Sequence, residues 1–589
     1  MVDRVKIKEW INRPVIMAML QNVFFLLLSL LVFHPHFEEN DDVFIASIAE
    51  GAYGARDSHL VYVNYLLGEI LGFFYRIYSG VRWHSVQQYV FLMIAFTAFS
   101  YILIREKKHG KLLSFMFLTC VFYEGYVSLQ YTKTAAMLTV IGYAVVLYSF
   151  RHVRRGEKSI EGFMTLGMIM LVYGALLRIS CFYMATVVFS VPFMLEMFSI
   201  SKETEAGYRK KLVFAYLTTF IVLFMTIGVF QFLDRQAYSS QKDWKSYSVF
   251  NENRTQLLDY RYDLMNYETD GERLTQLGVS ENDALLYLTW QFGDSGVFTN
   301  QLINKILNDA PSRSVDIDML KRLAAHLYEE IYGFNVLVMG IFCFSFWLII
   351  NRQKENIYLL TYLGAVTAVV LCYYEYSGRW NHRVVFAILF AVFILLVQYG
   401  EGEKRNVLLL AASICVFINI GLLLQDQFDY NRYIREEADG NAQLAAYTKQ
   451  HEEALFLIDP FTDQVTYRYD VFRPHQEGDF ANRTYLGGWL ARSPIYENVL
   501  DRYGYKNAFQ ALKSSPEDER VYLIDNYYPE EKLLYLKEHY GKEFLLESVD
   551  NIGGYEIYRV CKCFPYLYQL LHFKNQTLQF YCYFKAHIV

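Results

Sequence analysis

Four carboxylates stand within five residues directly after the first long apolar run. They are Glu38, Glu39, Asp41 and Asp42. Crowded carboxylates raise one another's pKa values, so one of them can act as a general base or as a ligand for a divalent metal ion. Acidic residues are also common caps at a helix N-terminus, and a helix is expected from near Val43. The cluster is therefore either a reactive site or a solvated acidic cap.

A second group of polar side chains follows in the same loop. Asp57 and His59 come shortly after Gly51, and Glu69 lies further along. Together with Glu39, these three side chains are candidates for a shaped polar pocket. The alternative is a turn that links two surface helices. No second His or Cys stands at ligand spacing from His59, which favours a surface histidine over a metal ligand.

Basic residues at the ends of several apolar runs form the third candidate group. An ionisable side chain at membrane depth is expensive and marks a functional site by default. An Arg guanidinium binds phosphate through a bidentate fork. The alternatives are snorkelling to lipid headgroups, or pairing with Glu124 and Glu375. The candidates are Lys133, Arg178, Arg379 and Arg383.

Membrane-spanning helices must position these residues. A span needs about 20 mainly apolar residues, because every backbone polar group must be satisfied inside the segment. Hydrophobic residues make up 54 % of the chain and charged residues 20 %, which excludes a disordered chain. The formal net charge of −6 gives no basic excess for binding nucleic acid. The candidate spans are Pro14–Phe33, Ser85–Ile104, Leu112–Ser128, Thr134–Phe150, Gly162–Leu177, Ile179–Ser199, Leu212–Leu233, Phe334–Ile350, Ile357–Tyr374, Val384–Tyr399 and Val407–Leu424, eleven in all.

Lys and Arg alternate between rich and poor loops along the chain. The N-terminus and every second loop are basic, whereas the intervening short loops contain only the four candidate cations. Basic loops stay in the cytoplasm, so we expect a cytoplasmic N-terminus and an extracytoplasmic C-terminus. The run Leu60–Tyr78 carries Asn64, Glu69 and Arg76, and counting it as a span would invert every later loop. We expect an interfacial amphipathic helix there.

This topology places three large segments outside the cytoplasm: His34–His84, Asp234–Gly333 and Gln425–Val589. Every cytoplasmic loop is short, and the chain has neither a G-x-x-x-x-G-K-[ST] phosphate loop nor a G-x-G-x-x-G motif. Chemistry is therefore expected on the outer face. The expected fold is a mainly α-helical polytopic membrane protein, with a membrane domain over residues 1–424 that includes outer loops at 34–84 and 234–333.

The C-terminal residues 425–560 predict a small extracytoplasmic α/β domain. Its expected elements are strands Ala454–Ile458 and Val521–Ile524, a helix Pro529–Tyr540 that ends at Gly541, and a hairpin of Phe544–Val549 with Tyr555–Val560. In the middle loop, Ser280 and Asp283 predict a capping box. Residues 561–589 are expected to form an irregular aromatic tail that holds Cys561, Cys563 and Cys582.

The layout resembles the GT-C class of integral-membrane glycosyltransferases. It shares the acidic motif Asn40-Asp41-Asp42 after the first span, an outer loop with surface helices, eleven passes and a soluble C-terminal domain. Asn40–Tyr75, and Trp244–Asp259 with Ser280–Trp290, further resemble uncharacterised bacterial multi-pass membrane proteins related to the glucosyltransferases that modify O-antigen. The layout covers nearly the whole chain, whereas the acidic motif is short.

The resemblance implies that a sugar moves from a polyprenyl-phosphate donor to an envelope glycan or lipid acceptor, with inversion, at the outer face of a bacterial plasma membrane. It implies an Asp of the first outer loop as general base, either Asp42 or Asp41, with Asp42 preferred. Some members use a divalent metal ion and others do not, and these two Asp residues would be its ligands here. The donor phosphate would be bound by Lys133, Arg178, Arg379 and Arg383.

Three other functions stay open. A polysaccharide polymerase or ligase also acts outside on lipid-linked glycans, but typically carries paired Arg residues in a large loop between late spans. A transporter is expected to show internal symmetry and broken spans near the midplane, and the sequence shows no repeat. A non-catalytic envelope assembly protein would use its outer segments only to bind partners.

Overall fold

The computed structural model of the chain describes residues 13–156, 161–203, 205–311, 313–332, 336–463 and 469–562. The predicted tail falls outside these residues except for Cys561 and Lys562, which end a strand. Internal contacts divide the chain into two compact units. The first comprises Met1–Lys242, Pro311–Arg435 and Val465–Glu477, and the second comprises Asp243–Ala310, Glu436–Gln464 and Gly478–Val589.

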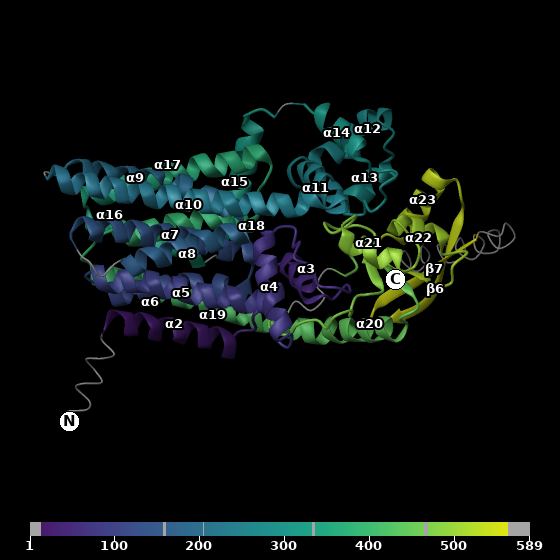
Figure 1. Ribbon diagram of the computed structural model, residues 1–589, viewed down its shortest axis with the longest axis horizontal. Helices are drawn as coiled ribbons and strands as arrows, with labels where there is room; N and C mark the ends of the chain where they lie inside the picture. Colours follow the sequence, from purple (N-terminus) through teal and green to yellow (C-terminus); the bar gives the residue numbers. More distant parts are fainter. Residues whose placement is uncertain are drawn as a thin grey trace, which may run out of the picture. The chain divides into compact units, whose positions relative to one another are not determined.

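The first unit is helical (Figure 1). Its α-helices are α2 (Pro14–Leu31), α3 (Asn40–Glu50), α4 (Tyr65–Ile77), α5 (Trp83–Glu106), α6 (Gly110–Phe122), α7 (Tyr131–Arg154), α8 (Glu161–Leu177), α9 (Ile179–Ser201), α10 (Ala206–Ser240), α15 (Ile317–Tyr332), α16 (Val336–Asn351), α17 (Lys354–Ser377), α18 (His382–Tyr399) and α19 (Arg405–Glu436). A π-helix, η1 (Tyr123–Val127), continues α6, and two short strands, β1 (His36–Phe37) and β2 (Ser128–Leu129), pair in parallel.

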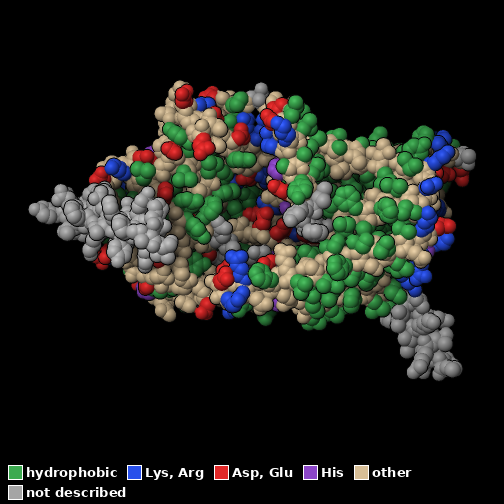
Figure 2. All heavy atoms as spheres, turned by 180° about the vertical axis from the view of Figure 1, so that it is seen from behind, with side chains coloured by type: hydrophobic (Ala, Val, Ile, Leu, Met, Phe, Trp, Pro, Cys, Tyr) green, Lys and Arg blue, Asp and Glu red, His purple; other side chains and the backbone are tan. Residues whose placement is uncertain are grey.

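Eight helices in the described residues are long and apolar enough to cross a membrane: α2, α5, α7, α9, α10, α17, α18 and α19. This confirms the prediction of a multi-pass membrane protein. The other three predicted spans coincide with shorter apolar helices, α8, α16 and α6 with its η1 extension, so the number eleven stays a prediction. In Figure 2, hydrophobic side chains cover much of the visible surface of the first unit, and Lys and Arg side chains gather at one end of this unit.

Helix α7 is the centre of the first unit. All of its most apolar window is buried, and it packs against α5, α8, α9 and α18 (Figure 1). The α7 and α8 backbones approach closely at glycines, because a Cβ on Gly142 would lie 3.0 Å from the carbonyl oxygen of Gly167. A helix that is apolar on every side belongs in such a position. The N-terminus of α7 is thereby held firmly, and it carries Tyr131 and Lys133.

The run Leu60–Tyr78 forms α4, which at 13 residues is too short to span a bilayer. Leu67, Leu71 and Tyr75 are buried on one face. Phe73 and Ile77 are exposed, at 54 % and 65 %. An interfacial position for α4 stays a prediction.

The second unit combines a mixed sheet with helices (Figure 1). Its helices are α11 (Lys242–Arg254), η3 (Thr255–Tyr260), η4 (Tyr262–Met265), α12 (Tyr267–Gln276), α13 (Glu281–Leu288), α14 (Asn300–Asn308), α20 (Ala438–Gln450), α21 (Pro494–Asp501), α22 (Ala508–Ser514) and α23 (Pro529–Tyr540). The strands β3 (Leu455–Ile458), β4 (Arg483–Tyr485), β5 (Val521–Ile524), β6 (Phe544–Ile552) and β7 (Tyr555–Lys562) are arranged in the order β4-β3-β5-β7-β6.

Several local predictions for the second unit are confirmed. Strand β5 and helix α23 have the predicted bounds, and Gly541 ends α23 in the left-handed conformation, with φ of 64°. Strands β6 and β7 form the predicted antiparallel hairpin, which turns at Gly553 and Gly554. The capping box of Ser280 and Asp283 begins α13. Strand β4 was not predicted, because its three residues carry no period of their own.

The two units cut across the domain boundaries expected from chain order. Residues 243–310 belong to the second unit and not to the membrane domain, because they pack on the α/β elements. The Tyr247 hydroxyl donates to the carbonyl of Trp489 at 2.7 Å, and the Tyr535 hydroxyl to Asp294 at 3.0 Å. Residues 469–477, which were expected in the C-terminal domain, pack with the first unit.

Candidate functional site

The short parallel pair of β1 and β2 fixes the acidic cluster, Glu38, Glu39, Asp41 and Asp42, beside the N-terminus of α7. His36 aligns with Ser128 and Phe37 with Leu129. The backbone N–H of Glu38 then donates to the carbonyl of Leu129 at 3.0 Å. The four carboxylates therefore leave this pair at a defined point, where α3 begins.

Asp42 is fully buried and both of its oxygens are occupied. Oδ1 lies 2.8 Å from Nε2 of His84 and accepts from the Gln88 amide at 3.1 Å. The backbone N–H of Tyr131 donates to both oxygens, at 3.2 and 3.1 Å. The side chain is 0 % exposed. Asp42 thus joins α3 to α5 and to the first turn of α7, the arrangement of an anchoring carboxylate.

Asp41 and Glu39 share one guanidinium at the start of α18. Nη1 of Arg383 donates to Asp41 Oδ2 at 2.7 Å and also contacts Glu39. The Asp41 side chain is 10 % exposed and that of Glu39 is 33 % exposed. In contrast with the fully buried Asp42, Glu39 is partly exposed and Asp41 retains a small exposed fraction. Arg383 holds their negative charge near the surface of the unit.

Burial raises the pKa of Glu39 from its usual 4.5 to about 7, against the opposing effect of Arg383 and with a smaller raising effect from Asp41. The charged form is the one that burial disfavours. Glu39 therefore changes charge close to neutral pH, directly beside Asp41.

Glu39→Gln should change how stability depends on pH. The folded chain holds the Glu39 proton up to about pH 7, whereas an unfolded Glu releases it near pH 4.5. Between these values the folded state binds more protons, so the free energy of unfolding falls as pH rises. We expect the wild type to lose stability relative to Glu39→Gln from pH 4.5 to 7 in thermal unfolding in detergent. The exposed control Glu268→Gln should run parallel to wild type, and a parallel Glu39→Gln curve would contradict the assignment.

Lys133 is buried and already paired with two carboxylates. Its ammonium lies 2.5 Å from Glu124 and also contacts Glu38, and its own side chain is 0 % exposed. This cation was expected to bind a donor phosphate. In this arrangement its charge is matched inside the protein, and it fastens the acidic cluster to η1.

Arg178 has an aromatic environment. Its guanidinium lies 5.2 Å from the ring centroid of Tyr62, and Nη1 lies 3.5 Å from the Tyr131 hydroxyl. Within the described residues it forms no ion pair with a carboxylate. Arg383 is close enough to repel it electrostatically. Two guanidinium groups therefore approach the same tyrosine, and only that of Arg383 has carboxylate partners.

The loop that carries Tyr62 is strained. Val61 has φ of 67°, which is an outlier for a β-branched residue. The Val61 N–H donates to the Tyr238 hydroxyl of α10 at 2.8 Å, and Asp234 accepts from the N–H of Tyr65 at 2.7 Å. Strain of this kind persists only where the surroundings enforce it. Here residues near the C-terminal end of α10 hold the loop so that Tyr62 lies beside Arg178.

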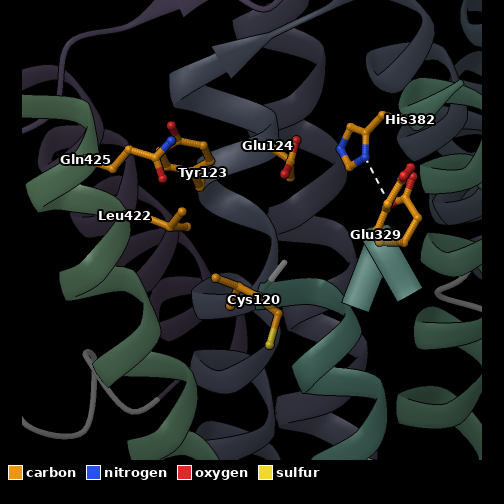
Figure 3. Close-up of a pocket in the computed structure, with 9 residues that line it drawn as sticks. Cys120, Tyr123, Glu124, Glu329, His382, Leu422 and Gln425 are labelled. Atoms are coloured by element: carbon orange, nitrogen blue, oxygen red, sulfur yellow. Dashed lines mark hydrogen bonds and ion pairs between the residues drawn. The ribbon is translucent and has the colours of Figure 1, made fainter. Parts of the chain in front are cut away.

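A cavity of about 360 Å³ is lined by side chains of the first unit that include Glu124 (Figure 3). Lys133 contacts both Glu124 and Glu38, and so links this cavity to the acidic cluster. His382, the residue before Arg383, bonds Glu330 through Nδ1 at 3.1 Å. Figure 3 shows His382 between Glu124 and the carboxylates of α15. The residues that line the cavity are Cys120, Tyr123, Glu124, Glu329, Glu330, Val336, His382, Leu422 and Gln425.

The remaining predicted site residues lie elsewhere in the first unit. Asp57 Oδ1 lies 2.6 Å from Nδ1 of His59, whose ring packs on Tyr65 and Tyr238. Glu69 hydrogen-bonds to Tyr65, which lowers the pKa of Glu69. The four residues predicted to form one pocket therefore lie in two groups. Glu39 belongs to the acidic cluster, whereas Asp57, His59 and Glu69 lie around Tyr65. Arg379 is half-buried in the link between α17 and α18.

Sequence reasoning missed a buried ion pair that holds residues 469–477. Arg82 Nε donates to Glu50 at 2.9 Å, and both side chains are almost fully buried. Arg82 also donates to the carbonyl of Asp470 at 2.9 Å, and the N–H of His475 donates to Glu50 at 2.8 Å. His84, which orients Asp42, was missed too. The only available signal was that these polar residues flank the predicted span at Ser85.

The acidic cluster is not a formed metal site. Asp41 pairs with Arg383, and the oxygens of Asp42 are taken by protein donors. In the described part of the chain, no group of three ligand atoms at coordinating distance includes either residue.

No protein-family model matches the chain, and no curated protein matches it. The crystal structure of ArnT from Cupriavidus metallidurans in the apo state is similar to it, with a TM-score of 0.35 and 9 % sequence identity. The match covers 91 % of this chain and 96 % of that one. A likeness at this level assigns neither family nor activity.

Proposed function

We propose that the protein is a GT-C type membrane glycosyltransferase. It moves a sugar from a polyprenyl-phosphate donor to an envelope glycan or lipid acceptor on the extracytoplasmic face. One observation carries the proposal. Asp41, whose side chain is 10 % exposed, and Arg178, which has no carboxylate partner among the described residues, both interact with Tyr131 at the N-terminus of α7. A base and a phosphate-binding cation are the two groups that this transfer needs.

In the proposed reaction Asp41 takes the proton of the acceptor hydroxyl. The hydroxyl oxygen forms the new bond to the anomeric carbon, while the bond from that carbon to the phosphate oxygen breaks. The lipid phosphate leaves with the electron pair, and Arg178 stabilises its added charge. Arg383 holds the Asp41 carboxylate in place through the 2.7 Å contact. Attack from the side opposite the leaving phosphate inverts the anomeric centre.

The contacts favour Asp41 over Asp42 as the base. A hydroxyl must come within about 3 Å of the base, and the oxygens of Asp42 are covered by His84, Gln88 and the Tyr131 N–H. We assign Asp42 to positioning. Likewise, Lys133 holds the acidic cluster, whereas Arg178 is the first candidate for the phosphate and Arg379 and Arg383 the next.

The cavity provides room for the sugar. Its volume of about 360 Å³ is within the range of small-molecule sites. Carboxylates and His382 line it and suit the hydroxyl groups of a sugar. Membrane lipids surround the exposed apolar faces of α9 and α10, where Val187, Met194, Phe214 and Met225 are exposed. The lipid part of the donor would lie among such side chains.

Mass spectrometry of envelope glycans and lipids from a deletion strain tests the proposal. We expect one sugar substituent to disappear and a polyprenyl-phosphate sugar to accumulate, with both changes reversed by the wild-type gene. Shortened glycan chains would instead indicate a polymerase or ligase. An unchanged profile would overturn the transfer and leave transport or assembly.

A further inference from the structure

A group of side chains in the second unit has the composition of a metal site. Asp283, Glu538 and His539 each offer one ligand atom, and these three atoms lie within 4.8 Å of one another. Asp283 lies in the first turn of α13, and the other two lie in the last turn of α23. The group is separate from the acidic cluster and the cavity of the first unit.

Ser280 orients the two carboxylates. Its hydroxyl donates to Glu538 Oε2 at 2.9 Å and accepts from the backbone N–H of Asp283 at 3.0 Å. Asp283 Oδ2 accepts from the Ser280 N–H at 3.0 Å. The other oxygen, Oδ1, faces Nε2 of His539 at 2.6 Å. One carboxylate oxygen and one imidazole nitrogen therefore point at each other, with the second carboxylate beside them.

The group has an excess of negative charge. Neither Asp283 nor Glu538 forms an ion pair with Lys or Arg among the residues that the structure describes, and the Asp283 side chain is only 2 % exposed. A third carboxylate, Asp294, acts on His539 electrostatically, and its Oδ2 accepts from the Tyr535 and Tyr540 hydroxyls. Buried charges are normally paired or coordinate a metal ion. His539 pairs with Asp283, whereas Glu538 has no cationic partner among the described residues, so a bound cation would complete the group.

We propose that Asp283, Glu538 and His539 bind a divalent transition-metal ion of the Zn²⁺ type. An imidazole with two carboxylates suits Zn²⁺, whereas Mg²⁺ and Ca²⁺ favour oxygen ligands alone. Zn²⁺ takes such ligands at about 2.0–2.2 Å and fills a fourth position with water. Glu538 is exposed, so its rotation closes the site at little cost.

The ion would link elements that are distant in sequence. Helix α13 belongs to residues 243–310, and α23 belongs to the α/β elements of the same unit. Apart from the site, the Asn282 amide donates to the carbonyl of Glu531 at 2.9 Å and aligns the two helices. A metal ion that binds only the folded arrangement stabilises it by mass action. The site would therefore stabilise the packing of α13 with α23 within the second unit, and it takes no part in the proposed sugar transfer.

Zinc binding by the full chain in detergent tests the site. The protein is freed of metal with a chelator, its thiols are alkylated, and Zn²⁺ alone is added. At the same concentration of Zn²⁺, we expect the wild type to bind one more equivalent than His539→Gln or Glu538→Gln. The affinity of this site for Zn²⁺ should be at least tenfold weaker in each variant. Zn²⁺, but not Mg²⁺, should raise the unfolding temperature of the wild type and slow amide hydrogen exchange in both α13 and α23.

The control is His451→Gln, which alters a histidine of the same unit whose Nδ1 bonds the Tyr447 carbonyl. It should retain the wild-type zinc equivalent. Equal zinc on the wild type and both site variants, or zinc protection confined to other helices, would overturn the proposal. Because Glu538 is exposed, Glu538→Gln should fold like the wild type. The zinc comparison can therefore be made with this variant even if His539→Gln unfolds.

Discussion

Asp41→Asn should lower the rate of sugar transfer by about 10²–10⁴-fold, the usual contribution of a general base, without changing the amount of protein in the membrane. Asn keeps the size of the side chain and can still accept from Arg383, which contacts Asp41 at 2.7 Å. It cannot accept the acceptor's proton. The measurement is kcat for transfer from a synthetic polyprenyl-phosphate sugar, with protein quantified in the same membranes.

Asp42→Asn is the matched comparison. This change removes a fully buried negative charge that bonds His84 and the Tyr131 N–H, so we expect less folded protein and a lower unfolding temperature. The protein that does fold should retain activity. Asp57→Asn, in the same loop but in the group around Tyr65, should retain both. Normal transfer by Asp41→Asn would exclude Asp41 as the base, and loss of transfer by folded Asp42→Asn alone would move the base to Asp42.

The sequence identified the acidic cluster but not the roles of its members. Adjacent Asp residues have almost the same local context, and what separates Asp41 from Asp42 comes from distant helices. Asp42 meets α5 at His84 and Gln88, whereas Asp41 meets α18 at Arg383. Such contacts depend on how helices pack, which periodicity and charge patterns do not encode.

Signals that act within one element were read correctly. Helix α23 and its Gly541 cap, the β6–β7 hairpin and the Ser280 capping box each depend on neighbours in sequence. Lys133 shows the opposite case. Its position at the end of a span suggested a phosphate ligand, but Glu38 and Glu124 reach it from two other segments. An isolated cation in sequence can be a paired one in the fold.

Arg178→Met should weaken binding of the polyprenyl-phosphate donor about 10- to 150-fold, because a hydrogen bond to a charged group contributes about 1.5–3 kcal/mol. Met keeps the apolar bulk between Tyr62 and Tyr131, and Arg178→Lys should recover part of the affinity as a point charge. KM for the donor should rise more than kcat falls.

Lys133→Met is the control. It leaves Glu38 and Glu124 without their shared cation, so it should lower the amount of folded protein instead. Arg178 has aromatic partners and no ion pair among the described residues, so its removal leaves no buried carboxylate unpaired. A donor affinity unchanged in folded Arg178→Met would show that the guanidinium serves only to pack between the two tyrosines.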